Sequence, residues 1–154
     1  RLAVTGPTGC RYLSGDRQQV YSQGGWNITG DTYVRDADGY YWFQARSDDM
    51  IISAGYNIAG PEVEQALLGH PDVVETAVVA APDPDRGSVV QAYVVLRDGV
   101  NGDAAKVAEL QAHVKAVIAP YKYPRRIAFA ASLPKTASGK LQRYRLRDLA
   151  AGLT

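Results

Sequence analysis

The sequence predicts an α+β fold, in which a small lobe with a β-hairpin and a three-stranded sheet packed with helices follows a β-ribbon annex. Three observations predict it: tight turns between short apolar runs in the first third, two long strand-like runs in the middle, and two segments with apolar residues at helical spacing. The length of 154 residues, with 46% hydrophobic and 21% charged residues, is typical of a globular protein.

The annex is predicted as β-ribbon over residues 1–45. Within it, residues 33–43 form two strand-like runs around a turn at 36–39, which is a hairpin signal. The chain begins with Arg1 in what reads as the middle of a ribbon, and its sole methionine is Met50. We therefore expect a piece of a longer polypeptide, with a trimmed leader as the alternative.

The lobe opens with a tight hairpin around Ala54-Gly55. Gly60-Pro61 then begins a helix, because Pro in the first turn loses no helical hydrogen bond, and Val63, Ala66 and Leu67 form its apolar face. The remaining elements are strands at about 73–81 and 88–96, a helix at about 103–118 with Val107, Leu110, Val114, Val117 and Ile118 on its apolar face, a strand at about 126–131, a loop at 133–140 and a short terminal helix.

Several classes of function are excluded by what the residues lack. The sole cysteine, Cys10, permits neither an internal disulfide nor a multi-cysteine metal site, and no signal peptide or apolar run of bilayer length is visible. Phosphate-loop and serine-hydrolase motifs are absent. His70 and His113 lack metal-ligand spacing, and His70 is interpreted as a helix C-cap. We expect a cytoplasmic protein with no membrane partner and no metal ligands.

Charge is unevenly distributed along the chain. Residues 1–119 hold 9 basic and 15 acidic residues, whereas residues 120–147 hold 8 basic residues and no acidic one. Such a stretch suits a phosphate ligand or polyanion, and a solvated basic face is the alternative.

Three polar segments call for explanation. Asp31 follows Thr-Gly, where a carboxylate forms a turn or accepts hydrogen bonds from a ribose diol. Arg46, Asp48 and Asp49 lie between annex and lobe, either as a local ion pair or as a hinge. Lys140 follows Ser-Gly in a loop of small residues, where a lysine is either solvated or offsets negative charge on a ligand.

Together, the motifs in these segments resemble the C-terminal part of the adenylate-forming acyl-CoA synthetases. The resemblance covers essentially the whole chain and is strongest to benzoate-, 2-aminobenzoate- and medium-chain acyl-CoA ligases. Ile52 and Ala45 replace the Lys and Gly of many relatives, as they do in that branch. The motifs that carry it, in family order, are Thr29-Gly30-Asp31, Arg46-x-Asp48-Asp49, Gly55-Tyr56-Asn57-Ile58 with Gly60-Pro61-Glu62-Val63-Glu64, and Pro134-Lys135-Thr136 with Ser138-Gly139-Lys140.

The resemblance implies a two-step reaction. A carboxylate attacks the α-phosphate of ATP, supplied with Mg²⁺, and the thiol of coenzyme A then attacks the acyl-adenylate. The family pattern makes Lys140 the catalytic cation and Asp48 the hinge, and it assigns Asp31 and Arg46 to the nucleotide. The coenzyme A and pantetheine contacts fall on Ala54, Gly55, Tyr121, Lys122 and Arg125.

The resemblance also implies a domain organisation. Residues 1–47 would be the end of a truncated large N-terminal adenylation domain, and residues 48–154 a mobile C-terminal domain. The missing domain would hold the Mg²⁺ ligand and the acyl pocket, so the fragment alone is expected to be inactive. Its partners would be that domain and a small carboxylic acid. The alternatives are a peptide-synthetase-like adenylation domain and a stand-alone nucleotide- or nucleic-acid-binding module; we expect no nucleic-acid partner, because the module leaves Asp31, Asp48 and Gly55 unexplained.

Overall fold

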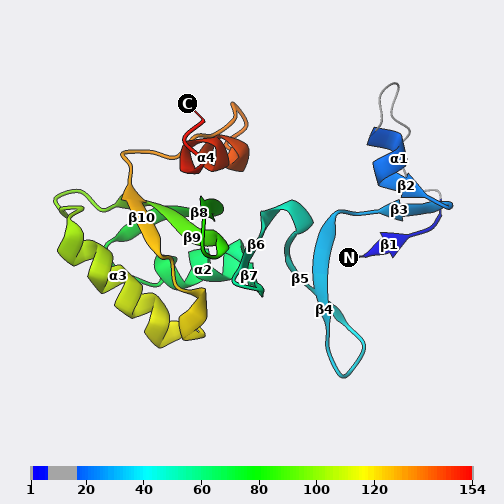
Figure 1. Cartoon of the computed structure of the whole chain (residues 1–154), viewed down its shortest axis with the longest axis horizontal. Coiled ribbons are helices and arrows are strands. Elements are labelled where there is room, and N and C mark those ends of the chain that lie inside the picture. The colour runs from blue at the N-terminus through cyan, green and yellow to red at the C-terminus, as the bar shows by residue number, and fades with distance from the viewer. Residues whose placement is uncertain (1, 7–16, 154) are drawn as a thin grey trace. The chain divides into compact units, whose positions relative to one another are not determined.

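The computed structural model describes residues 2–6 and 17–153, and Cys10 lies outside them. The chain divides into two compact units, Arg1–Asp48 and Asp49–Thr154 (Figure 1). The sequence predicts this boundary between residues 47 and 48. In the described part of the chain, no helix is both long enough and apolar enough to cross a membrane.

The first unit holds a small antiparallel sheet and a hairpin. Strands β1 (Ala3–Val4), β3 (Trp26–Ile28) and β2 (Ser22–Gln23) form the sheet in that order, and β4 (Asp31–Arg35) pairs with β5 (Tyr41–Arg46). The prediction of β-ribbon throughout residues 1–45 is wrong at α1 (Arg17–Tyr21). This segment begins Arg-Gln-Gln, three residues that lose little rotamer freedom in a helix.

The predicted hairpin at residues 33–43 is confirmed by the pairing of Tyr33 with Phe43. One carboxylate organises its turn: Asp36 accepts hydrogen bonds from the Tyr40 amide (2.8 Å) and the Trp42 indole (2.6 Å). The indole hydrogen bond lowers the pKa of Asp36 below its ordinary value. Gly39 completes the turn at φ +92°, a conformation that glycine adopts without penalty.

The second unit begins with the predicted tight hairpin. A 3₁₀ turn, η1 (Ser47–Asp49), leads into β6 (Met50–Ser53), which pairs with β7 (Tyr56–Ala59). Ala54 at φ 48° and Gly55 at φ 82° both have the left-handed conformation that a two-residue hairpin of this twist requires. The Ala54 amide donates to the Arg86 carbonyl, so the tip is held against the next hairpin of the unit.

A three-stranded sheet packed with helices forms the rest of the unit, as predicted, and the helices cover both of its faces. Its strand order is β10 (Arg126–Phe129), β9 (Gly87–Leu96) and β8 (Val73–Asp83), with β10 parallel and β8 antiparallel to β9. The remaining elements are α2 (Gly60–Leu68), α3 (Ala104–Val117), η2 (Pro120–Lys122) and α4 (Arg143–Ala150).

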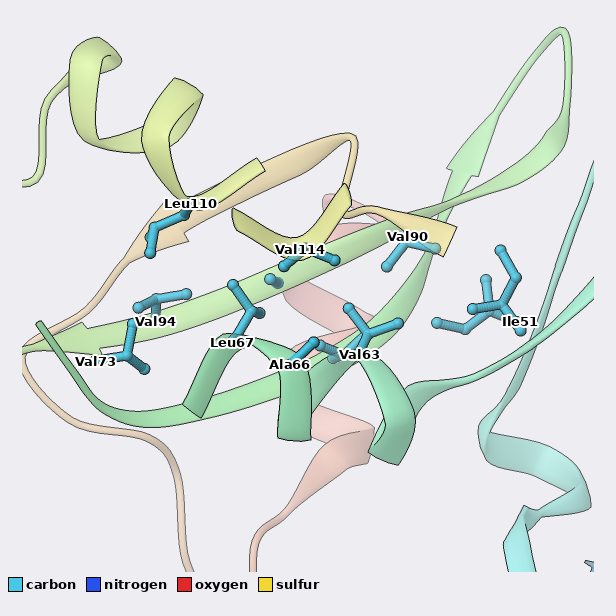
Figure 2. Packing of buried hydrophobic residues seen from close by; sticks show 12 residues of the cluster. Ile51, Val63, Ala66, Leu67, Val73, Val90, Val94, Leu110 and Val114 are labelled. Atoms are coloured by element: carbon cyan, nitrogen blue, oxygen red, sulfur yellow. The ribbon is translucent and has the colours of Figure 1, made fainter. Parts of the chain in front are cut away.

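Successive side chains of β8 point to opposite faces of the sheet, which explains why helices pack on both faces. Val78 of β8 packs with α2 and α3 in the main hydrophobic cluster, whereas its neighbours Ala77 and Val79 pack with Leu146 of α4 in a second cluster. Figure 2 shows side chains of α2 and α3 meeting those of the strands and of β6 in the main cluster. The labelled members are Ile51, Val63, Ala66, Leu67, Val73, Val90, Val94, Leu110 and Val114.

Two side-chain predictions in this unit are wrong. Val117 is 57% exposed, because it ends α3 on the solvent side and the following residue, Ile118, packs against the core instead. The His70 ring does not cap helix carbonyls. Its Nε2 lies 3.0 Å from Glu109, and its Nδ1 accepts a hydrogen bond from the Asp72 amide, so the ring joins α2 to α3.

Candidate functional site

The two predicted nucleotide residues and the predicted hinge residue meet at the end of the first unit. Asp31 begins β4 and pairs in register with Arg46, the last residue of β5. Arg46 Nη1 lies 3.5 Å from Asp31 Oδ1, and Arg46 Nε lies 3.6 Å from Asp48 Oδ1. The Arg46 guanidinium thus bridges the carboxylates of Asp31 and Asp48.

Gly30 and Thr29 present the Asp31 carboxylate. Gly30 has φ +75°, so the turn suits glycine for its backbone, and a Cβ there would lie 3.0 Å from Arg46 Nη2. The Thr29 hydroxyl accepts from the Asp31 amide and donates to the Leu2 carbonyl. The Arg46 side chain is 56% exposed, and an exposed ion pair of this kind is worth little, so both partners can turn to a ligand at small cost.

The predicted coenzyme A residues divide between two clusters in the second unit. Tyr56, next to the Ala54-Gly55 tip, stacks on Tyr121 with ring centroids 4.6 Å apart. Lys122 is held by Glu62, with Nζ 2.6 and 2.7 Å from the two carboxylate oxygens. The tip, an exposed aromatic platform and a buttressed lysine therefore lie close together.

Arg125 belongs to the other cluster. Its Nη1 donates to the Tyr123 hydroxyl (3.1 Å), and its guanidinium lies 5.1 Å from the Tyr123 ring centroid. Lys115 Nζ lies 4.0 Å from the same centroid. Sequence reasoning named Tyr56 only as part of a motif and did not name Lys115, and their contacts with Tyr121 and Tyr123 bring both into these clusters.

The loop that carries Lys140 is a closed, hydrogen-bonded turn. The Thr136 amide donates to the Lys140 carbonyl (2.8 Å), and the Lys140 amide donates to the Thr136 hydroxyl (3.0 Å). Gly139 takes φ +80°, and Lys135 and Leu141 form a β-bridge at the base. Lys140 is exposed, and its ammonium has no partner among residues 2–6 and 17–153. The backbone of Lys140 is thus fixed while its charge is free.

An ionic network beside this turn was missed altogether. Arg143, at the start of α4, forms a two-pronged pair with Glu64 of α2, and Arg147 pairs with Asp49 at 2.7 Å. The hydrogen bond to Glu64 is the main cause that raises the pKa of Arg143 above its ordinary value. The partners are far apart in the chain, so no local pattern could indicate them.

A group of possible metal ligands, His70, Asp72 and Glu109, was also missed in sequence. Lys106 Nζ lies 2.7 Å from Asp72 and 2.6 Å from Glu109, so an ammonium already supplies the positive charge there. Hydrogen bonds from Lys106 lower the pKa values of both carboxyls. The group is therefore a satisfied ion-pair network between α2 and α3.

One family model matches about half of the chain. It is that of the AMP-binding enzyme C-terminal domain, and it matches residues 62–140, from the lysine-buttressing Glu62 to Lys140 itself. The chain belongs to this family. Together with the relatives described next, this match confirms the predicted resemblance to acyl-CoA synthetases.

Curated relatives agree with the family. The chain is 52% identical over 132 residues to an uncharacterized acyl-CoA ligase, YtcI, of Bacillus subtilis (strain 168), covering 86% of the chain and 25% of that protein. It is 50% identical over 141 residues to the mitochondrial acyl-coenzyme A synthetase ACSM5 of Homo sapiens, covering 90% of the chain and 24% of that protein. The chain thus spans about a quarter of the length of these relatives.

A solved structure confirms the fold class. The o-succinylbenzoate CoA synthetase MenE of Bacillus subtilis, in complex with its acyl-adenylate intermediate, matches with a TM-score of 0.81 at 36% identity. The match covers 95% of the chain and 30% of that protein.

Proposed function

We propose that this chain is the C-terminal part of an AMP-forming acyl-CoA ligase, which activates a carboxylic acid with ATP and transfers the acyl group to coenzyme A. The observation that carries the proposal is the Lys140 turn, in which a fixed backbone presents an ammonium that has no partner in the described part of the chain. The family match supports it.

In the first step, the attack of a carboxylate on a phosphate brings two anions together. The Lys140 ammonium would lie between them and stabilise the charge of the transition state, which lowers the barrier most when the cation is preorganised. Asp31 would accept hydrogen bonds from the ribose hydroxyls, and Arg46 would leave its weak ion pairs for ribose or phosphate. ATP would enter with Mg²⁺, for which no residue of this chain is assigned.

In the second step, the thiol of coenzyme A must reach the acyl carbon of the acyl-adenylate, beside which Lys140 would lie in the first step. Rotation about Asp48 would withdraw Lys140 and bring the Ala54-Gly55 tip to the same place. The space beside Gly55 is open, because a Cβ built there would meet nothing within 4 Å. A thin pantetheine chain could therefore approach the backbone of the tip closely. Tyr121 offers a ring for stacking, and Lys122 and Arg125 supply positive charge for the phosphates of coenzyme A.

The acid is proposed to be medium-chain or benzoate-like. The resemblance of the motifs to medium-chain acyl-CoA ligases favours the first, and the similarity to an o-succinylbenzoate CoA synthetase favours the second. A cytoplasmic location stays a prediction.

The test is ATP–pyrophosphate exchange by the full-length protein that contains this chain, with hexanoate, benzoate and 2-aminobenzoate in turn. We expect one acid to support exchange and Lys140→Ala to lower it by about 100-fold or more. Arg145→Ala is the matched control, because Arg145 is an exposed cation whose side chain, among the described residues, hydrogen-bonds to the neighbouring Tyr144 hydroxyl alone. Exchange that survives Lys140→Ala would remove this lysine from the mechanism, and no exchange with any acid would refute the proposed ligase activity for these substrates.

A further inference from the structure

We propose that Arg143 is a positioning residue for Lys140: its two-pronged pair with Glu64 fixes the end of the Lys140 turn in the orientation needed for adenylate formation. The inference rests on the proposed function of Lys140. It concerns a residue that touches neither substrate nor reacting atoms.

The geometry places Arg143 where it can control the turn. It lies three residues after Lys140 and is the first residue of α4. Its Nη1 and Nη2 donate to Glu64 Oε1 and Oε2, the second at 2.9 Å, and Nη1 also donates to the Val78 carbonyl at 3.2 Å. Such a fork fixes both the position and the plane of the guanidinium.

Glu64 is itself held rigidly. It lies on α2 among buried apolar residues, its side chain is 12% exposed, and Oε1 accepts the Val78 amide at 2.8 Å. The network therefore joins three elements, α2, β8 and α4, at one carboxylate.

The cost of this arrangement indicates a role beyond stability. Two charges withdrawn from water lose hydration that their attraction barely repays, and apolar residues of similar size often stabilise a fold as well or better. The ion pair instead fixes the orientation of the Arg143 guanidinium, which an apolar contact does not do. Orientation is needed here, because the N-cap residue of α4, Gln142, makes no side-chain cap.

The other end of the turn is anchored separately. Leu133 is buried, and Lys135 Nζ lies 2.6 Å from Glu75 on β8. The Gln142 amide closes the stem on the Pro134 carbonyl at 2.9 Å. With one end tied to β8, the direction in which Lys140 points is set by where α4 begins. Leu146 and the Arg147–Asp49 pair hold the body of α4, and the pair of Arg143 with Glu64 holds its first residue.

This role predicts an effect on one half-reaction only. Lys140 acts in adenylate formation and is withdrawn before the thiol attacks, so a misplaced turn should slow the first step and spare the second. A displacement of about 1 Å at a reacting group can cost about 100-fold in rate. A residue needed only for folding would reduce both steps together.

The experiment uses the full-length protein with Arg143→Lys, which keeps the charge without the fork, and Arg143→Met, with Arg145→Ala as the control. Pyrophosphate exchange reports the first step, and acyl transfer from a synthetic acyl-adenylate to coenzyme A reports the second. We expect Arg143→Lys and Arg143→Met to lower the kcat of exchange by about 10- to 100-fold, with acyl transfer within about 2-fold of wild type. Equal loss in both steps, or wild-type exchange in Arg143→Lys, would overturn the proposal.

Hydrogen exchange separates this inference from the proposed function. The amides of Thr136, Gly139 and Lys140 are hydrogen-bonded within the turn, and we expect them to lose protection in Arg143→Met but to keep it in Arg145→Ala. Unchanged protection in Arg143→Met refutes the positioning role even if the wild-type protein activates none of the acids. Wild-type protein that lacks exchange activity while Arg143→Met loses protection refutes the ligase proposal alone.

Discussion

Replacing Gly102 with alanine would place a methyl group in space that the Phe129 ring occupies. A Cβ built at Gly102 lies 2.5 Å from both Phe129 Cγ and Cδ2, and 3.0 Å from Phe129 Cβ. The backbone of Gly102 is outside the left-handed region, so the expected cost is one of contact alone. Because Phe129 ends β10 and packs against the main cluster, its ring cannot move without disturbing the sheet edge.

The magnitude follows from that overlap. Carbon atoms in contact normally lie about 3.5–4.0 Å apart, so the ring or the loop must move by about 1 Å. Overpacking of this kind costs about 1–3 kcal/mol, and each kcal/mol lowers the Tm by about 4–8 °C for a unit of roughly 100 residues such as Asp49–Thr154. Urea unfolding followed by circular dichroism measures the free energy of unfolding directly.

A double-mutant cycle with Phe129→Leu supplies the control. Phe129→Leu removes part of the ring that the new methyl would meet, so Gly102→Ala should cost less in that background than in wild type. An equal cost in both backgrounds, or no cost in wild type, would refute the reasoning from the contact.

Three further perturbations test the second unit. Asp103→Ala removes the side chain that caps α3 through the Lys106 amide (2.9 Å), and should lower the free energy of unfolding by about 0.5–2 kcal/mol in urea titrations; no change would contradict the cap. Leu110→Ala empties a fully buried position and should cost about 2–5 kcal/mol by the same assay, whereas a loss below 1 kcal/mol would mean that the site collapses. Lys106→Met removes the ion pairs in which the Lys106 ammonium lowers the pKa values of Asp72 and Glu109. In the wild type, these two carboxylates stabilise the fold above their unfolded pKa values of about 4. This stabilisation is lost as the pH falls through their lower folded pKa values. The variant should therefore lose less stability than wild type as the pH falls below about 4, and parallel stability curves would contradict the assignment.

Much of the fold could be predicted because its signals are local. The strands 73–81 and 88–96 were found from apolar runs, and the Ala54-Gly55 turn from its small residues between two such runs. The short helix α1 was missed because five residues inside a region of turn and strand signals carry too little periodicity to be recognised.

The candidate site was predictable only where its motifs are continuous. Lys140, Asp31 and Arg46 were found from short segments and a family resemblance, and their roles stay predictions. The partners of Arg143 and His70 could not be found, because Glu64 lies 79 residues from Arg143 and Glu109 lies 39 residues from His70. Contacts at such separations depend on how helices cross a sheet, which no local pattern contains.

Two consecutive aspartates have a practical consequence for protein engineering. Asp48 pairs with Arg46 in the first unit, whereas Asp49 pairs with Arg147 in the second. A fusion joint at the peptide bond between them would leave each carboxylate with its own arginine. Exchanging the second unit between members of this family at this bond should therefore preserve both ion pairs, while a joint moved one residue to either side would have to import a matching partner from the donor sequence.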